Sequence, residues 1–535
     1  MVDRNGIKRT SIRRSNINAI QKNNFHAAKI IGNMIRTSFG PKGLDKMTIN
    51  SLGDIFIVND GKTILEKVDY KHPIAKTLLD ITKTVTSSIG DGSISAVLLA
   101  TSLIDRASEL MERGIHPNVI AKGYAMSLSK SLDILKEQGM AFHPSDKECL
   151  KRIVKTSLTP KIPLDEFDVL SDLIIRAVTM VSESDDSELK WMPTEYVKVV
   201  AREWLPLSES KLIDGIAFDA SVFDSGMPKI IKGARIAIVQ SLIGIRETKF
   251  RPEINIADPQ YIGSFKTSER AIIMAMIKQV IASGVNVLFT HKGIDDSTKG
   301  LLTASGILTV RRVPLKDIEK IERSTGAKMV LSPDDLTQKS LGYADCVKEV
   351  DMSEKKWIVV DGGKMHRAAT ILVGDVIQRS ADNIEDVLNR TIHLLRQSVK
   401  EPITVAGGGA CEMEISHRLR SWASSVHGRK QLAVDNYSKA LESIPLSLAI
   451  NSGMNPLDTI SELRNRHTTG GRYLGIDTRN LKISDMRRKG VIEPMKLKEQ
   501  ILESATDAAI SIIMVSDVYR RSKIRSNWSP PKEPE

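Results

Sequence analysis

The feature that most constrains the fold is a change of pattern along the chain, from long helices to short strands and back to long helices. In the first third, apolar residues recur at helical spacing, and prolines and glycines mark helix ends. One helix with its apolar residues at 27–35 is predicted to stop near Pro41, and three more are predicted at about 73–90, 93–113 and 117–138. After Gly374 helical patterns return, at 382–400, 410–425, 431–451 and 497–519. The two ends therefore share a helical character that the middle lacks.

The middle block, from Ile213 to about Ile371, alternates short strands with helices. Its β-branched runs at 234–241, 285–290 and 329–332 are typical of buried strands. One helix between them has clear end signals, because Asp258 can cap it, Pro259 takes its first position and Gly284 ends it. The order predicts a multidomain α/β fold in which an α/β domain is inserted into a mostly helical one.

Composition excludes several classes of protein. The 535 residues suggest roughly three or four domains. The three cysteines lie far apart without a CxxC pair, which excludes a zinc ribbon and favours a reducing compartment. No apolar run reaches the roughly 18–20 residues of a membrane span, and no signal peptide is evident, so we expect a cytoplasmic protein. The net charge of +12 is spread along the whole chain, which disfavours nucleic-acid binding.

Three glycine-rich turns are the candidates for chemistry. The first, 90–95 (GDGSIS), joins two predicted helices, so free amides at the start of the second helix could bind phosphate. Asp91 suits the Mg²⁺ that accompanies a nucleotide, and its alternative role is an ordinary turn cap. The other two turns are 38–43 (SFGPKG) and 406–410 (AGGGA). Asp60, in an Asn-Asp-Gly turn, is a further carboxylate that could bind metal or orient water, or simply stabilise the turn.

The order of these motifs resembles one known family. The segments are FGPKGLDKM, VNDGKTIL, HPIAK, IGDGSISAVLLA, GIHPNVI, KTSLT, GMPK, KGIDD, RRV, AGGGACE and GVIEPMKLK. They resemble the group II chaperonins, which comprise archaeal thermosome and eukaryotic cytosolic chaperonin subunits, over about residues 15–520. The chain looks like an archaeal thermosome paralogue with a degenerate hydrolysis site.

The resemblance implies a chaperonin fold with three domains. These are an equatorial ATP-binding domain (1–142 and 401–535), an intermediate domain (143–212 and 363–400) and an apical client-binding domain (213–362) with a lid protrusion at about 246–276. It also implies that paralogous subunits form a double ring and that unfolded client proteins are bound. The apolar residues near the protrusion that could bind clients are Phe250, Ile254, Ile256, Tyr261, Ile262 and Phe265.

For the cofactors ATP and Mg²⁺ the resemblance implies a site residue by residue. The implied ATP-binding residues are Ser38, Phe39, Gly40, Pro41, Asp60, Gly61, Gly92, Ser93, Ile94, Ser95, Gly407, Gly408, Val491 and Glu493. Asp91 is the implied Mg²⁺ ligand. Ile94 replaces a hydroxyl that the family has, and losing a hydrogen bond to a charged group costs roughly 1.5–3 kcal/mol of affinity.

A larger departure lies at Arg390. The family has an Asp at this position that activates the attacking water, and an Arg cannot act as a general base. Arg390 could pair with a γ-phosphate, or with Asp386 one helical turn earlier. Asp386 lies about 6 Å away along the helix axis, too far to replace the missing base without rearrangement.

The function that we expect is an ATP-dependent chaperonin subunit with weak hydrolysis of its own, working in a mixed ring. One alternative is a fully active ATPase whose water is oriented by Asp60. Another is a structural ring or filament subunit that does not use nucleotide. ATP binding and phosphate release separate these three functions.

Overall fold

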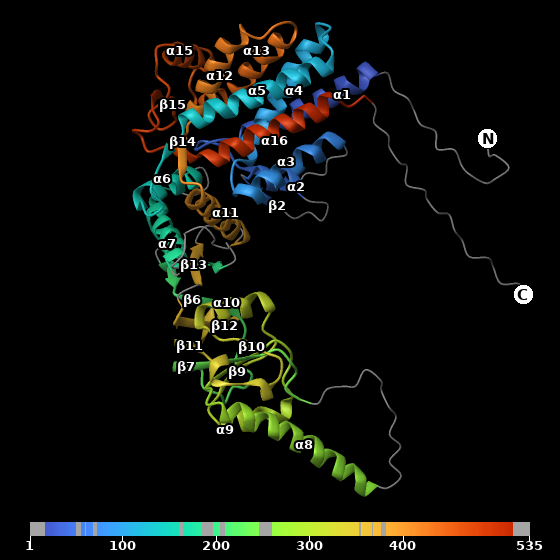
Figure 1. The fold of residues 1–535 in the computed structure, drawn as a ribbon, viewed down its shortest axis with the longest axis vertical. Coiled ribbons are helices and arrows are strands. Elements are labelled where there is room, and N and C mark those ends of the chain that lie inside the picture. The colour runs from blue at the N-terminus through green and yellow to red at the C-terminus, as the bar shows by residue number, and fades with distance from the viewer. Residues whose placement is uncertain are drawn as a thin grey trace, which may run out of the picture.

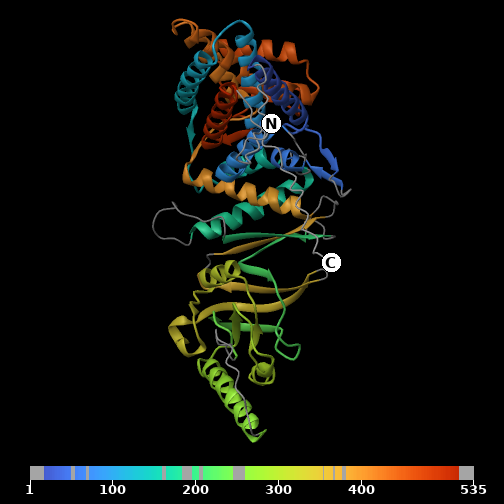
Figure 2. The same ribbon diagram turned by 90° about the vertical axis from the view of Figure 1, so that its right-hand side faces the viewer.

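The protein is elongated, with a helical body at one end of its long axis and a smaller α/β body at the other (Figure 1). The computed structural model describes residues 17–49, 55–58, 60–67, 72–159, 164–183, 196–203, 209–244, 259–352, 355–365, 368–375 and 381–516. A connecting region of helices and a small sheet lies between the two bodies (Figures 1 and 2). The predicted multidomain α/β architecture, with an α/β body inserted into a mostly helical one, is confirmed.

The helical body combines the two ends of the chain. It contains α1 (Ile17–Arg36), α2 (Gly61–Lys67), α3 (Pro73–Ile89), α4 (Ser93–Glu112), α5 (Pro117–Gln138), α12 (Ala410–Ala423), α13 (Lys430–Leu441), α14 (Ser443–Ser452), α15 (Pro456–Thr468) and α16 (Met495–Ile513). The rings of Tyr124 on α5 and Tyr437 on α13 meet edge to face at 5.5 Å. The Tyr437 hydroxyl lies 2.8 Å from Thr506 Oγ1 on α16, so this core joins segments from both chain ends.

Local end signals explain several of these helices. α3 begins where the His72 side chain accepts a hydrogen bond from the Ile74 amide, with Pro73 at its first position, and it ends at Gly90 in the left-handed region. α5 repeats this start, with His116 and Pro117. The prediction of a single helix at 431–451 is wrong. The chain forms α13 and α14 there, and Pro445, which has no amide hydrogen, lies in the first turn of α14.

Short strands complete the helical body. β1 (Lys46–Ile49) and β2 (Ile55–Val58) form an antiparallel hairpin, which projects from the side of the body (blue, right, in Figure 2). A three-stranded sheet joins distant segments in the order β17 (Ile492–Pro494), β14 (Ile403–Ala406), β3 (Met140–Ala141). β15 (Leu474–Asp477) and β16 (Lys482–Asp485) form a second hairpin.

Two helices of the connecting region were not predicted from the sequence, and a third was. They are α6 (Lys147–Leu158), α7 (Leu164–Glu183) and the predicted α11 (Ala381–Lys400). Its sheet has the order β4 (Val197–Glu203), β13 (Ala369–Asp375), β5 (Lys211–Ile213), with β4 and β13 parallel. Its apolar residues continue the core of the helical body without a break.

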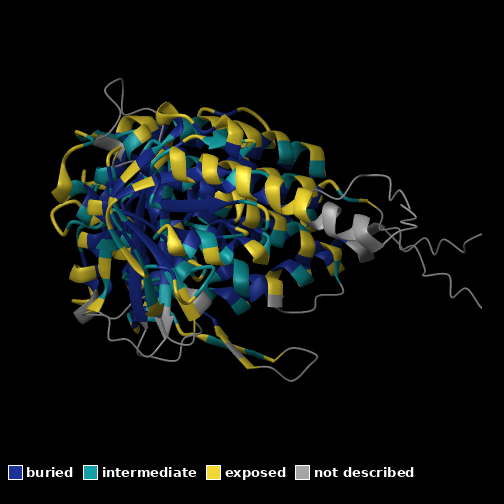
Figure 3. Ribbon diagram, turned by 90° about the horizontal axis from the view of Figure 1, so that it is seen from below, coloured by how far each residue is buried: buried dark blue, intermediate teal, exposed yellow. Residues whose placement is uncertain are grey.

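The α/β body is built on a seven-stranded sheet. Its order is β6 (Gly215–Asp219), β12 (Lys355–Gly363), β11 (Gly342–Met352), β7 (Ile230–Val239), β8 (Val287–Thr290), β9 (Leu308–Val310), and β10 (Met329–Val330) also pairs with β7. The helices are α8 (Pro259–Ala282), α9 (Lys299–Ala304) and α10 (Leu315–Thr325), with short 3₁₀ turns at Asp296–Thr298, Pro333–Asp335 and Gln338–Ser340. Along β7, Ile236 and Ile238 enter one core while Ala237 and Val239 enter the other, so both faces of the sheet are covered. Figure 3 shows the buried residues in the interior and the exposed ones around it.

The predicted protrusion is described only in part. α8 begins at Pro259 as expected. Of the predicted client-binding residues, Phe250, Ile254 and Ile256 lie outside the described residues, and so do the side chains of Tyr261, Ile262 and Phe265.

Candidate functional site

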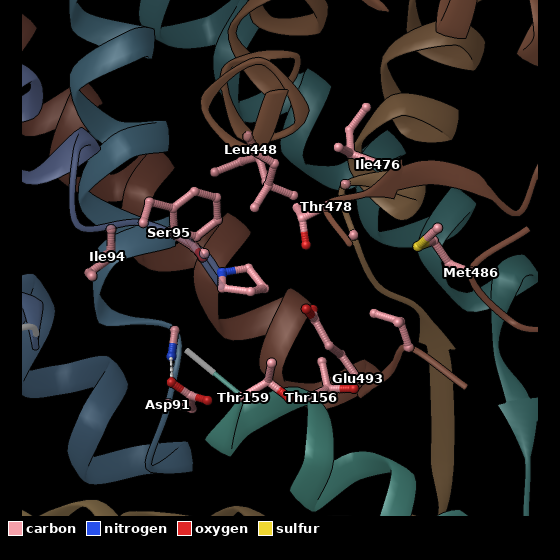
Figure 4. A pocket seen from close by; sticks show the side chains of 18 of the residues that line it. Asp91, Ile94, Ser95, Thr156, Thr159, Leu448, Ile476, Thr478, Met486 and Glu493 are labelled. Carbon is pink, nitrogen blue, oxygen red and sulfur yellow. Dashed lines mark hydrogen bonds between the residues drawn. The ribbon is translucent and has the colours of Figure 1, made fainter. Parts of the chain in front are cut away.

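A pocket of about 360 Å³ lies in the helical body where the connecting region meets it. Segments that are far apart in the sequence line it, among them those that carry Asp60 before α2, Leu448 of α14 and Glu493 of β17. Six further segments contribute. They are the turn after α1, the α3–α4 turn, the end of α6, the triple-glycine turn before α12, the β15–β16 hairpin and the start of α16. The volume is that of a small-molecule site. Figure 4 shows side chains from these segments converging on one space.

Most of the predicted site residues meet in this pocket. Its lining includes Ser38, Phe39, Gly40, Pro41, Asp60, Asp91, Gly92, Ser93, Ile94, Ser95, Gly408, Val491 and Glu493. Gly61 packs directly against the lining residue Ile94, since a Cβ added to Gly61 would be 2.7 Å from Ile94 Cγ1. Gly407 is also adjacent, because an added Cβ there would be 3.2 Å from Glu493 Oε1. Arg390 is not in the lining, although its partner Asp60 is.

The start of α4 gives the pocket an anion-binding character. Gly92 is the N-cap of α4 and has φ +85°, a conformation that favours glycine. A Cβ at this position would also lie 2.8 Å from atoms of both Leu497 and Ile501. Because Gly92 has no side chain, no side-chain hydrogen bond caps the first amides of α4. These amides and the helix dipole favour a phosphate group at this end of the pocket.

Asp91 is held beside this helix start by two hydrogen bonds. The Gly92 amide donates to Oδ1 at 2.9 Å, drawn as the dashed line in Figure 4. The Ser157 hydroxyl, at the end of α6, donates to Oδ2 at 2.6 Å. The carboxylate is therefore oriented from both the helical body and the connecting region, and it still lines the pocket.

The opposite end of the pocket is apolar. Leu448, Ile476 and Met486 lie together there, across the space from Asp91 (Figure 4). Leu448 and Ile476 belong to one small core with Met413, so this wall is anchored in the body. An apolar wall facing a polar helix start suits a ligand with a flat ring at one end and an anion at the other.

A buried ion triad lies behind the polar end. Lys498 Nζ is 2.7 Å from Glu412 Oε1 and also pairs with Glu493, and the Lys498 and Glu412 side chains are each only 6% exposed. Burial raises the pKa of Glu493; Lys498 opposes this shift and Glu412 adds to it. Burial works against the charge of Lys498, but the two carboxylates raise its pKa and keep it protonated. One lysine thus serves two carboxylates, and Glu493 points into the pocket (Figure 4).

Arg390 pairs with both of the carboxylates nearest to it. Its guanidinium pairs with Asp386, one turn earlier on α11, as one of the two sequence hypotheses held. Its Nη1 also lies 2.5 Å from Oδ1 of Asp60, a partner that the sequence did not indicate. Burial alone would lower the pKa of Arg390, but Asp60 and Asp386 outweigh burial and raise the pKa, so the guanidinium stays charged.

The pocket also contains residues that sequence reasoning missed. Lys155, Thr156 and Thr159 come from the end of α6, and residues 476–480 come from the β15–β16 hairpin. The KTSLT segment was a family motif, so it could have pointed to the first group. The hairpin carries no local signal of a site, because its residues reach the pocket only through tertiary folding.

The residues present fit a magnesium nucleotide. Among the described residues, no group of three or more His, Cys, Asp or Glu side chains could hold a metal ion by itself. Mg²⁺ in nucleotide sites is commonly held by one or two carboxylates together with the substrate's phosphates, and Asp91 beside the uncapped start of α4 is such an arrangement.

Comparisons with known proteins agree with the fold. The TCP-1/cpn60 chaperonin family matches residues 31–523. The chain is 38% identical to thermosome subunit beta of Archaeoglobus fulgidus, over 93% of this chain and 91% of that protein. It is 39% identical to a thermosome subunit of Methanopyrus kandleri, over 93% and 91% of the two chains. Thermosome subunit alpha of Sulfolobus acidocaldarius is 37% identical, over 94% and 92%.

Within the described part of the chain, no helix has the length and apolar character needed to cross a membrane. The resemblance that the motifs indicated is confirmed across almost the whole sequence. The chain belongs to the TCP-1/cpn60 chaperonin family, as a subunit of the group II type found in archaeal thermosomes.

Proposed function

We propose that this chain is an ATP-binding chaperonin subunit that hydrolyses ATP weakly and works beside competent paralogous subunits in a double ring. The observation that carries the proposal is the pairing of Arg390 with Asp60. Arg390 occupies the position of the family's water-activating Asp, and the remaining candidate base, Asp60, is engaged by this guanidinium. A general base typically contributes about 10²–10⁴-fold to a rate. Hydrolysis by this chain is therefore expected to be slower by that factor than hydrolysis by a family member that has the base.

The residues of the pocket have distinct proposed roles. The amides of α4, with the hydroxyls of Ser93 and Ser95, bind phosphate groups. Asp91 holds the Mg²⁺ that would neutralise phosphate charge, and Ser157 orients Asp91. Glu493 contacts the ribose, and the wall of Leu448, Ile476 and Met486 contacts the base. Ile94 contributes no hydroxyl, so the affinity for phosphate is lower than in family members that have one.

The three-part division is proposed with the boundaries expected from the sequence. The helical body corresponds to the equatorial domain (1–142 and 401–535), the connecting region to the intermediate domain (143–212 and 363–400) and the α/β body to the apical domain (213–362). α4 comes from the first part of the chain and α16 from the last part, and buried residues of both helices belong to one core. This shared core supports an equatorial domain that is built from both ends of the chain. The apolar side chains of Ile272 and Ile281 on α8, 53% and 42% exposed, support client binding by the apical domain.

Ring assembly is supported by the β1–β2 hairpin. Met47 pairs with Ile57 and Ile49 pairs with Ile55, so the four side chains share one face of the ribbon. Their exposed fractions lie between 57% and 66%. A two-stranded hairpin is marginally stable alone, and an apolar face of this kind normally marks an interaction site. We propose that it packs on a neighbouring subunit.

Two alternatives are less well supported. A fully active ATPase that uses Asp60 needs this carboxylate free to hold water, and Arg390 engages it. A structural subunit that does not bind nucleotide has no use for a pocket that combines an uncapped helix start, Asp91 and an apolar wall, and the chain has such a pocket.

The test uses the purified full-length chain, alone and mixed with a competent thermosome subunit. Sedimentation velocity reports ring assembly, calorimetry with Mg·ATP reports binding, and phosphate release reports hydrolysis. We expect binding with slow release. Absence of binding would favour the structural alternative, and release at the rate of the competent subunit would favour the active ATPase.

A further inference from the structure

Helix α11 is joined to the wall of the nucleotide pocket by a buried ion pair. The side chains of Arg390 and Asp60 are only 8% and 9% exposed, whereas Asp386, the other partner of Arg390, is 49% exposed. Exposed ion pairs contribute little because water and salt screen them, so the Asp60 pair is the one that matters for position. The pair joins the connecting region to the helical body.

Asp60 is itself fixed at the start of α2. Its Oδ2 accepts hydrogen bonds from the Thr63 amide at 2.9 Å and from the Thr63 hydroxyl at 3.0 Å. Its Oδ1 lies 3.4 Å from the Ser93 hydroxyl at the start of α4. Arg390 is therefore bound to an anchored carboxylate, and the ion pair determines where α11 lies relative to α2 and α4.

The backbones also pack closely around this pair. Gly90, in the turn before Asp91, lies so near α11 that an added Cβ would be 2.3 Å from the carbonyl oxygen of Arg390. Two turns further along α11, Gln397 Nε2 donates to the Ser88 carbonyl at 3.2 Å. α11 thus lies against the turn that carries Asp91 along the segment from Arg390 to Gln397.

The sign of the charge at position 390 decides how this contact responds to ligands. In a chain with Asp at position 390, two carboxylates would face each other here, and they would repel until a cation came between them. In this chain the two groups attract. We call α11 closed where it lies against the α3–α4 turn, as here, and open where it lies away from that turn. A buried ion pair gains little over two solvated ions. Replacing a repulsion with an attraction nevertheless shifts the equilibrium between the two positions of α11 towards the closed one.

We propose that Arg390 and Asp60 form a latch that holds α11 closed against the pocket whether or not a nucleotide is bound. The proposal rests on the proposed function only in taking the pocket as a nucleotide site. Its consequence is that this subunit does not need ATP to keep its connecting region closed.

The test is hydrogen–deuterium exchange of the full-length chain without nucleotide, read on the amides of residues 388–398. The variants are Arg390→Gln, Asp60→Asn and the double variant, and Asp386→Asn is the matched control because it removes only the exposed partner. We expect slow exchange in the parent that Mg·ATP does not slow further. Either single variant should exchange roughly tenfold faster or more, as for strongly coupled ion-pair partners, and the double variant no faster than the singles.

A second pair of variants covers the case in which Arg390→Gln does not fold. Gly90→Ala places a methyl group against the Arg390 carbonyl, whereas Gly114→Ala carries similar backbone strain, with φ +79°, and has no atom within 4 Å of the added Cβ. Only Gly90→Ala should speed exchange in α11. Fast exchange in the nucleotide-free parent, or unchanged exchange in both Arg390→Gln and Gly90→Ala, would overturn the latch. Because the comparisons between parent and variants are made without nucleotide, a failure to bind ATP would overturn the proposed function alone.

Discussion

The hydroxyl of Ser157, in the last turn of α6, lies 2.6 Å from Oδ2 of Asp91 in the α3–α4 turn, although 66 positions separate the two residues in the chain. Asp91 is the proposed Mg²⁺ ligand, so Ser157 is a positioning residue for it. The bond also connects the helical body to the connecting region, as the Arg390–Asp60 pair does. Both contacts reach the pocket from helices outside the helical body.

Ser157→Ala should weaken the Mg²⁺ dependence of nucleotide binding. Outer-shell hydrogen-bond partners typically change metal affinity by about 10–100-fold, and we expect a loss in that range. A calorimetric titration of Mg²⁺ at a fixed ATP concentration measures this loss of Mg²⁺ affinity. Ser157→Thr should retain most of the affinity. The matched control is Ser171→Ala on α7, whose hydroxyl donates to the carbonyl of Asp168 on the same helix. Equal Mg²⁺ affinity in Ser157→Ala and in the control would contradict the positioning role.

Asp91→Ala should abolish Mg²⁺-dependent nucleotide binding and leave the fold intact, because a turn carboxylate contributes little to core packing. Calorimetry with Mg·ATP measures binding, and circular dichroism with sedimentation measures folding and assembly. Asp105→Ala, which removes an exposed carboxylate on α4 that pairs with Lys29, is the control. Binding of Mg·ATP by Asp91→Ala as tightly as by the parent would show that the phosphate end of the pocket is assigned wrongly.

The pattern of the chain predicted most of this fold, for identifiable reasons. α5 has its signals in the sequence itself, with Pro117 at the start and Gly139 after the end. The break between α13 and α14 was missed because apolar residues continue across Glu442 at helical spacing. α6 was missed because it is short and its buried face is interleaved with charged residues, and its N-cap Asp146 was the remaining signal.

For the site, motifs identified the turns but not the contacts. Gly92 and Asp91 were predicted from one local segment, and both lie at the pocket. The two partners of Arg390 show which contacts a sequence can predict and which it cannot. Asp386 could be predicted from its position one turn away on the same helix, whereas Asp60 is brought there by the packing of α11 on the helical body. Helical spacing cannot indicate such a contact.

Glu493→Gln should make the fold more stable at neutral pH. Burial raises the pKa of Glu493 above the ordinary value of 4.5, so between these two values the folded chain binds more protons than the unfolded chain. The parent therefore loses stability as pH rises through this window. The variant lacks this loss and leaves Lys498 balanced by Glu412 alone.

Urea unfolding of both chains at a series of pH values measures this effect. The advantage of Glu493→Gln should grow from about pH 4.5 upward and then level off above the raised pKa. Glu503→Gln, an exposed position on the same helix, is the control and should show no such trend. An advantage that shrinks as pH rises would contradict the sign of the pKa shift. Nucleotide binding by Glu493→Gln should be weaker, since Glu493 points into the pocket.

Met47→Lys combined with Ile57→Lys should prevent ring assembly while the chain stays folded. The two residues form one cross-strand pair on the exposed face of the β1–β2 hairpin, and charges there cannot be buried against a neighbour. Sedimentation velocity measures the result. Leu331→Lys, at a 68% exposed residue of the α/β body, is the control. Rings of normal size from the double variant would remove the hairpin from the subunit interface.

If the parent hydrolyses ATP weakly, as proposed, Arg390→Asp should recover part of the missing activity. The substitution restores the carboxylate that the family uses to activate water, and it replaces the attraction to Asp60 with a repulsion that Mg²⁺ can relieve. Recovery is expected to be incomplete, because Asp60 and Asp386 are like charges next to the new carboxylate and raise its pKa. The upper bound is the about 10²–10⁴-fold typical of a general base.

The assay is phosphate release from parent and variant rings at saturating ATP, with assembly checked by sedimentation. Arg396→Asp, which makes the same charge change six residues further along α11, is the control and should release phosphate at the parent's rate. Saturating ATP is needed because Ile94 is proposed to lower the affinity for ATP, and a binding defect would otherwise hide a gain in the chemical step. Parent rings that already hydrolyse ATP as fast as a competent thermosome would overturn the degenerate site. The water would then be oriented by a group other than the one at position 390, and Asp60, released from Arg390 when nucleotide binds, would be the residue to substitute next.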